Sequence, residues 1–248
     1  MVLACASSLS FAQSWNWATA FFSTGQSSVE SVAALDDGGA LVCGEFNDTL
    51  RSGADTLVSH GGQDGFLARL DGSGAVLWLK GVGGAFDDEL NEVVVDGAGN
   101  AYAAATFSDT VSWAGSPIPG TGNGATLVKF DLAGGMQWYR RAVGNSYGYT
   151  ISVGTNALVY LGGVLNSSAA FSGTTLTNNS GIYNAFLVRY DANSGALQDA
   201  SVISGSSGDY GAYGMDVDQA GYAYLTGYSR PQQNPYVGTF MRKLAFDG

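Results

Sequence analysis

One sequence pattern returns along this chain at a fixed distance. The segment GFLARLDGSGAVLW ends at Trp78, and the related segment ATLVKFDLAGGMQW ends at Trp138, 60 residues later. A basic residue followed two positions later by an aspartate occurs three times with the same 60-residue spacing, at Arg69 and Asp71, Lys129 and Asp131, and Arg189 and Asp191. A fixed period of this kind is typical of proteins in which similar structural units stack on one another.

The later copies keep the pattern less strictly. Gln198 replaces the tryptophan in the third copy, and Lys243 takes the basic position in a fourth copy, 54 residues after Arg189. The smaller step predicts a shorter loop in the fourth unit.

The interior of one unit predicts four β-strands. The segment VVVDGAGNAYAAATF, residues 93–107, places β-favouring residues on both sides of a Gly/Asp/Asn turn, as in a β-hairpin. Hairpins of the same kind recur as AALDDGGALVCGEF, ISVGTNALVYLGG and MDVDQAGYAYLTG. Asp96 stands in the turn of the first hairpin quoted and Asp218 in the turn of the last. In the second unit we expect strands at about 91–96, 100–107, 125–131 and 135–142, with a loop that carries a short extended piece between the middle two. Four antiparallel strands make one blade of a β-propeller.

We therefore predict an all-β fold, a β-propeller of four-stranded antiparallel blades with a period of about 60 residues, over residues 13–248. The blades are expected at about 26–84, 85–144 and 145–205, with a truncated one at 206–248. The text WNWATAFF, residues 15–22, matches the fourth-strand text LWLKGVGG, so residues 14–22 are expected to close the last blade. About three and a half blades form an incomplete ring, because known propellers have about 4–8, and we interpret the chain as the N-terminal portion of a longer one.

Other repeat architectures fit the chain less well. Leucine-rich and β-helix repeats are shorter, at about 20–29 residues or fewer. Helical repeats need apolar residues at a period of 3.6 and few glycines, whereas this chain has 37 glycines in 248 residues. A β-sandwich does not repeat the sequence of its strands at a fixed step.

Three longer segments carry a resemblance to a known family. FSGTTLTNNSGIYNAFLVRYDANSGAL, GGQDGFLARLDGSGAVLWLKGVGG and GDYGAYGMDVDQAGYAYLTGYS resemble SBBP-type β-propeller repeats, over about residues 14–248. The resemblance implies a secreted or surface-exposed scaffold, often bacterial, in some members with a C-terminal secretion and sorting domain. It implies no particular chemistry.

The net charge and the first residues of the chain indicate which partners and which cellular location to expect. The net charge of −11 argues against a nucleic-acid partner, since an acidic surface repels phosphate. Residues 1–12 are interpreted as the remnant of a secretory signal peptide, because an apolar stretch precedes the small-x-small triplet Ser10-Phe11-Ala12. Cleavage there removes Cys5 and leaves Cys43 without a partner, as a buried strand residue. No later segment is long and apolar enough to span a bilayer.

The joins between blades hold the candidate ligand-binding residues. They read GVGGAFDDE, AVGNSYGYT and SGSSGDYGAYG, and loops that enter the innermost strands of a propeller gather at one mouth of its channel. The residues expected there are Asp87, Asp88, Tyr147, Tyr149, Asp209, Tyr210 and Tyr213. Aromatic rings with carboxylates suit a neutral polar ligand such as a glycan, or a peptide. The structural alternative is that the glycines allow close packing and the tyrosines fill the space between sheets.

The remaining polar motifs favour structural roles. The turns DDGG, DGAGN and DQAG suggest calcium, but they lack the six or so oxygens of a calcium loop, and Asx turns account for Asp96, Asn100 and Asp218. Trp78 and Trp138 are expected to pack between blades, although quinone-dependent dehydrogenases also carry such tryptophans. His60, the only histidine, stands beside Asp64 in a loop and does not by itself make a catalytic triad. We expect no cofactor, with calcium as the alternative.

These observations favour a non-catalytic binding or interaction module with a carbohydrate or protein partner at the blade-entry mouth. Two alternatives stay open. One is a propeller enzyme, either a polysaccharide lyase or hydrolase or a quinone-dependent dehydrogenase. The other is a passive structural spacer of a surface adhesin.

Overall fold

The computed structural model describes residues 16–178, 183–203, 209–230 and 238–245, and none of these residues is in an α-helix. Every strand pairing among them is antiparallel, and none of the sheets closes on itself. The prediction of an all-β fold is confirmed. No helix among these residues has the length and apolarity to cross a bilayer.

Each sheet is built on strands that pair in chain order. The first sheet contains β2 (Ser27–Ala34), β3 (Ala40–Phe46), β6 (Asp64–Leu70) and β7 (Val76–Gly84). The second contains β8 (Glu89–Val95), β9 (Ala101–Ser108), β12 (Asn123–Phe130) and β13 (Met136–Arg141). The third contains β14 (Val143–Val153), β15 (Leu158–Phe171), β17 (Asn184–Asp191) and β18 (Leu197–Ile203). The fourth contains β19 (Asp209–Val217), β20 (Ala223–Arg230) and β21 (Gly238–Leu244).

The long loops of the first three units carry further short strands, and in the second unit these form a hairpin that joins the sheet before it. The hairpin of β10 (Val111–Trp113) and β11 (Ser116–Ile118) pairs with the end of β7. The hairpin of β4 (Thr49–Ser52) and β5 (Asp55–Val58) pairs in the same way with β1 (Phe22–Ser23). In the third unit, β16 (Thr174–Leu176) pairs with the end of β15, which in turn pairs with the start of β14. The sequence indicated only a short extended piece here and missed the exchange between units.

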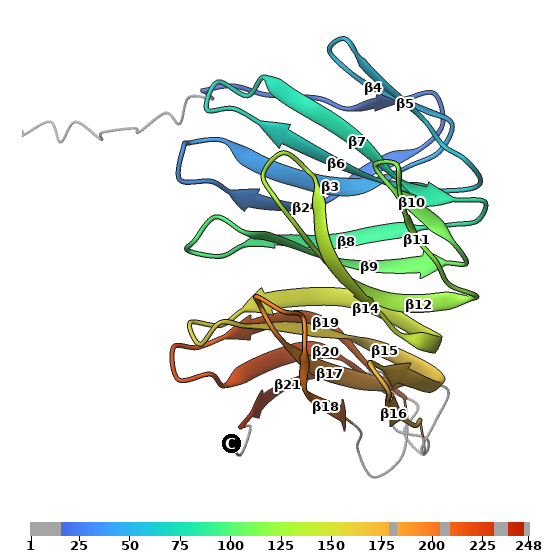
Figure 1. The fold of residues 1–248 in the computed structure, drawn as a ribbon, viewed down its shortest axis with the longest axis vertical. Helices are drawn as coiled ribbons and strands as arrows, with labels where there is room; N and C mark the ends of the chain where they lie inside the picture. The colour runs from blue at the N-terminus through green and yellow to red at the C-terminus, as the bar shows by residue number, and fades with distance from the viewer. Residues whose placement is uncertain (1–15, 179–182, 204–208, 231–237, 246–248) are drawn as a thin grey trace, which may run out of the picture.

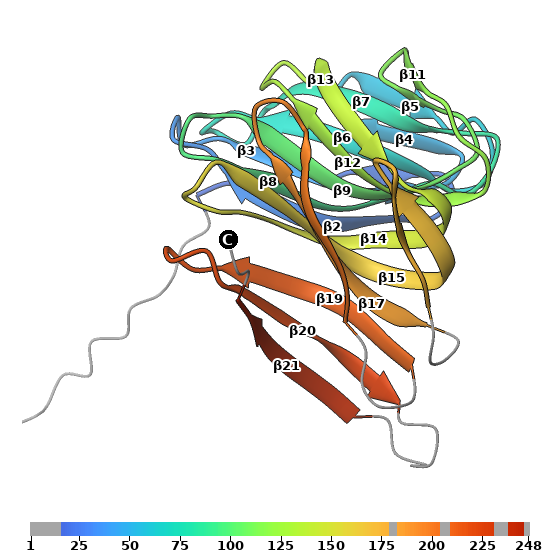
Figure 2. The ribbon, with the colours of Figure 1, turned by 60° about the horizontal axis from the view of Figure 1, so that its bottom comes forward.

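The first three sheets follow one another along the longest axis of the molecule, and the fourth overlaps the third in this view (Figure 1). Their first strands touch in series: β2 contacts β8, β8 contacts β14, and β14 contacts β19. Figure 2 shows the last sheet, β19–β21, fanning out below β14 and β15. The first strands therefore form a continuous row, and loops that enter them lie near one another.

Hydrophobic cores lie between the sheets. Leu41 and Leu67 of the first sheet pack with Phe107 and Phe130 of the second, and the Trp113 ring of the exchanged hairpin joins them. Further cores lie between the second and third sheets and between the third and fourth. Because both faces of a sheet are covered, the central strands β3, β9 and β17 are buried along almost their whole length.

The repeated tryptophan and basic residues connect neighbouring sheets. The indole N–H of Trp78 donates to the Leu132 carbonyl at 3.0 Å, and Arg69 donates to the same carbonyl at 3.2 Å. One unit later, Trp138 donates to the Asn193 carbonyl at 3.1 Å, and the buried Lys129 donates to the Ala192 carbonyl at 2.9 Å. Each outer hairpin is thus held against the outer turn of the next sheet.

The same contact occurs at the start of the chain. The Trp17 ring lies against Gly74 in the outer turn of the first sheet, so close that a Cβ at Gly74 would fall 2.5 Å from the ring. The Thr19 hydroxyl donates to the Gly74 carbonyl, and the Phe21 ring packs on Phe66 at 5.1 Å. Residues 17–23 therefore lie against the first sheet as β7 lies against the second. Residues 1–15, which include the predicted signal peptide, are outside the described ranges.

The repeated aspartates close the turns of the hairpins. In Asp71, Asp96, Asp131 and Asp218 one carboxylate oxygen accepts the backbone N–H groups two and four residues later, and in Asp191 those two and three residues later. This is Asx-turn geometry. The hydrogen bonds, led by the one from the Ser73 hydroxyl, lower the pKa of Asp71. The last two basic anchors pair with acids: Arg189 lies 3.8 Å from Asp199, and Lys243 lies 3.6 Å from Asp218.

Candidate functional site

A carboxylate fixes the entry to two of the first strands, β8 and β19. Oδ1 of Asp87, just before β8, accepts the backbone N–H of Gln63 at 3.0 Å. Oδ1 of Asp209, at the start of β19, accepts the N–H of Tyr183 at 3.2 Å. Gln63 and Tyr183 both precede the third strand of the preceding sheet, so the two aspartates make the same connection between neighbouring sheets.

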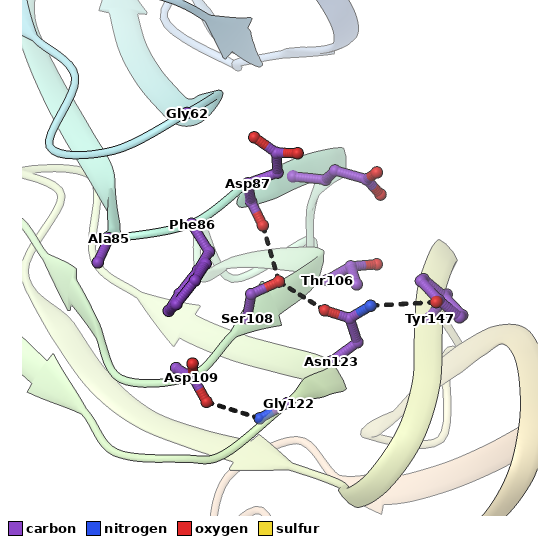
Figure 3. A pocket seen from close by; sticks show the side chains of 11 residues that line it. Gly62, Ala85, Phe86, Asp87, Thr106, Ser108, Asp109, Gly122, Asn123 and Tyr147 are labelled. Atoms are coloured by element: carbon purple, nitrogen blue, oxygen red, sulfur yellow. Dashed lines mark hydrogen bonds between the residues drawn. The ribbon is translucent and has the colours of Figure 1, made fainter.

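An open cleft of about 600 Å³ lies at the entry to β8 (Figure 3). Its walls come from the loop before β6, the join after β7, the start of β8, the end of β9, the start of β12 and the middle of β14. The lining residues are Gly62, Ala85, Phe86, Asp87, Glu89, Thr106, Ser108, Asp109, Gly122, Asn123 and Tyr147. The Phe86 side chain is 54% exposed, so an apolar ring and several polar groups are offered together.

A hydrogen-bonded chain crosses the cleft wall. The Ser108 hydroxyl lies 2.9 Å from the Asp87 carbonyl and 2.5 Å from Asn123 Oδ1, and Asn123 Nδ2 donates to the Tyr147 hydroxyl at 3.0 Å (Figure 3). Asp109, with a φ of +51°, accepts the Gly122 N–H at 2.8 Å. These contacts hold the polar side chains in place before any ligand arrives.

The cleft is acidic. Burial raises the pKa of Glu89, with the charges of Asp87 and Glu30 adding to the effect. The nearby Arg141 guanidinium donates to the backbone carbonyls of Phe107, Asp109 and Gly122, so its donors are used within the loops. Among the described lining residues there is no histidine, cysteine or lysine. The wall therefore offers hydrogen-bond acceptors and an aromatic surface.

Two of the predicted ligand-binding residues, Asp88 and Tyr210, are buried. Asp88 is fully buried and accepts the N–H groups of Gly84 and Ser108, each at 2.7 Å, and burial raises its pKa to about 7. Tyr210 is 8% exposed and packs edge-on against Phe240 in the core between the third and fourth sheets. Asp88 therefore lies buried just before β8 and Tyr210 lies buried near the start of β19, and neither lines the cleft.

Four of the other predicted residues divide between two places, and Asp209 lines neither of them. Asp87 and Tyr147 line the cleft. Tyr149 and Tyr213 line a second, smaller cavity with Glu30, Ser31, Asn91 and Glu92. The loop between β18 and β19, residues 204–208, lies outside the described ranges.

Sequence reasoning missed Phe86, Ser108 and Asn123. A signal existed, because Ser108-Asp109-Thr110 repeats Asn47-Asp48-Thr49 at a step of one unit, and Asp48 shares the positive φ, at +60°. His60, by contrast, has a side chain that is 74% exposed, and its backbone N–H donates to the Asp64 carboxylate. No group of three or more His, Cys, Asp or Glu within the described ranges could hold a metal ion.

Comparison with protein-family models finds none that matches this chain, and comparison with curated proteins finds no similar sequence.

Proposed function

We propose that this chain is part of an extracellular or cell-surface β-propeller of the SBBP-repeat type, and that it acts as a non-catalytic binding module. Four antiparallel sheets in series, with first strands that contact one another in order, support the propeller. The placement of residues 17–23 against the first sheet supports their role as a fourth strand.

The ligand we propose for the cleft is a glycan. A sugar presents hydroxyl groups that pair with fixed acceptors and donors, and C–H faces that pack on an aromatic ring. The observation that carries this proposal is the exposed Phe86 ring beside the Asp87, Asn123 and Tyr147 groups in one cleft of about 600 Å³.

The test is a glycan array probed with the full chain and with matched variants. We expect Phe86→Ala to abolish binding and Tyr147→Phe, which removes only the hydroxyl, to weaken it. Phe22→Ala is the control, because Phe22 is 70% exposed and does not line the cleft. Loss of binding in both phenylalanine variants, or none in either, would overturn the assignment.

The same experiment separates the alternative functions. Release of shortened sugars from a bound glycan would identify a polysaccharide lyase or hydrolase. Binding to a protein but to no glycan would move the ligand class to a peptide. A passive spacer predicts no binding in any arm.

A further inference from the structure

Each of the four first strands contains a β-bulge at the same place. The register shifts between Val29 and Ser31 in β2, between Leu90 and Glu92 in β8, between Gly148 and Thr150 in β14, and between Ala212 and Gly214 in β19. The residues left without a strand partner are Glu30, Asn91, Tyr149 and Tyr213. A bulge re-aims a side chain out of the regular alternation of a strand.

These four residues meet in one cavity. Because the first strands touch in series, the bulges lie side by side, and their residues line a cavity of about 280 Å³ with Ser31 and Glu92. Each unit therefore contributes one side chain to a shared site, although these side chains are of three different kinds.

One wall of this cavity belongs to a row of stacked tyrosines. The rings of Tyr147 and Tyr149 lie 6.2 Å apart and almost parallel, at 11°. Tyr149 and Tyr213 stack at 4.9 Å, and Tyr213 and Tyr228 lie 5.8 Å apart. Tyr213 is 52% exposed, so part of its ring is open to a ligand.

Carboxylates form the rest of the wall. Glu30 is exposed, and Glu92 accepts the Ile151 N–H at 2.7 Å. Burial raises the pKa of the Tyr149 and Tyr213 phenols, and the nearby charge of Glu89 adds to this effect. Both phenols therefore stay neutral. The cavity lining contains no lysine, arginine or histidine among the described residues.

The face of an aromatic ring attracts organic cations where it is open to them, as part of the Tyr213 ring is, and carboxylates without a basic neighbour in the cavity add to that attraction. A bare divalent metal ion fits poorly, since it needs several converging oxygens and the described residues hold no such cluster. We propose that this cavity, lined by Glu30, Asn91, Glu92, Tyr149 and Tyr213, binds an organic ammonium or guanidinium group. The group belongs to a free amine or to a lysine or arginine side chain of a peptide. This proposal does not rest on glycan binding at the neighbouring cleft.

The test is calorimetric titration of the full chain with choline, spermidine, a short lysine- and arginine-rich peptide, and a peptide of the same length without charge. We expect the cationic probes to bind and the uncharged peptide not to bind. A preference for the peptide or for spermidine identifies the source of the group.

Matched variants decide whether the cavity is the site. Tyr213→Leu removes the ring face while keeping apolar volume, and we expect binding to weaken about 2- to 30-fold, whereas Tyr213→Phe keeps it. Glu30→Gln should weaken binding more than Asp55→Asn, an equal change of charge on the exposed β4–β5 hairpin. Tyr222→Leu, outside the cavity, should have no effect.

Two results would overturn the proposal. Equal losses in the Glu30 and Asp55 variants would mean that only the overall negative charge attracts the cation. Unchanged binding in a folded Tyr213→Leu variant would exclude the aromatic wall. Because Phe86→Ala should affect glycans and leave cations unaffected, failure of one proposal is distinguishable from failure of the other.

Discussion

Trp78 donates its indole N–H to the backbone carbonyl of Leu132, 3.0 Å away, across the boundary between the first and second sheets. Trp138 repeats this contact with Asn193 one unit later. The repeated tryptophan therefore connects neighbouring units, and its contribution to the free energy of unfolding can be measured.

We expect Trp78→Ala to lower the free energy of unfolding by about 1–3 kcal/mol, because the half-buried ring and its hydrogen bond are lost together. Trp78→Phe keeps most of the ring and should cost about 0.5–1.5 kcal/mol. Leu77→Ala is the control on the same strand, since Leu77 is 52% exposed. Urea unfolding monitored by circular dichroism measures all three, and a Trp78→Ala variant as stable as the control would contradict the role.

Three of the four bulges, those in β2, β14 and β19, lie opposite a glycine, whereas the β8 bulge lies opposite Ala105. A Cβ at Gly163 would fall 1.9 Å from the Tyr147 carbonyl, and Gly44 and Gly227 are as close to the carbonyls of Ser28 and Gly211. We expect Gly163→Ala to destabilise the protein by about 2–4 kcal/mol, because the backbone at the bulge must move. Gly97→Ala, where a Cβ meets nothing within 4 Å, should change stability by less than about 0.5 kcal/mol. Thermal unfolding compares the two, and equal melting temperatures would show that the bulge tolerates a side chain.

Asp88 should make stability depend on pH. Burial raises its pKa in the folded protein to about 7, whereas an unfolded aspartate titrates near 3.9. The folded state holds this proton more tightly, so the contribution of Asp88 to stability is complete below about pH 4 and is lost as the pH rises through about 7. We expect the urea midpoint to fall over this range in the unaltered chain and to fall less in Asp88→Asn.

Asp55→Asn serves as the comparison for the Asp88 prediction, because Asp55 is exposed on the β4–β5 hairpin and should leave the pH dependence as it is. A pH profile that is the same in all three proteins would place the titrating group elsewhere.

Calcium removal should have no effect on stability. The carboxylates of Asp71, Asp96, Asp131 and Asp218 already accept two backbone N–H groups each, so these turns need no ion to close. We expect the same melting temperature with calcium and with a chelator, and a loss of about 0.5–1.5 kcal/mol for each hydrogen bond removed in Asp96→Ala. A melting temperature that rises with calcium would contradict this assignment.

The repeat made much of the fold predictable. The step from Arg69 to Lys129 gave the length of a unit, and the second-unit strands expected at about 91–96 and 125–131 appear as Glu89–Val95 and Asn123–Phe130. Period and turn residues are local signals, because each acts within one hairpin. The pairing of β10 with β7 of the preceding sheet depends on residues far apart in the chain, and the sequence of residues 111–118 does not indicate which strand they pair with.

The candidate site was less predictable for a related reason. The bulges occur in the segments VES, LNE, GYT and AYG, and no residue type is common to all four. Each bulge changes which side chains beyond it face outward. Alternation alone therefore could not tell that Tyr149 and Tyr213 line a cavity while Tyr210 is buried.

The exchanged hairpins also bear on how the chain acquires its structure during synthesis. The edge of β7 is covered by β10, which is made only after the whole β8–β9 hairpin. As the chain leaves the ribosome from its N-terminus, the first sheet must therefore wait, with the edge of β7 open, until β10 emerges. Completion of the first sheet is expected to lag behind its own translation, with a chaperone most useful during that interval.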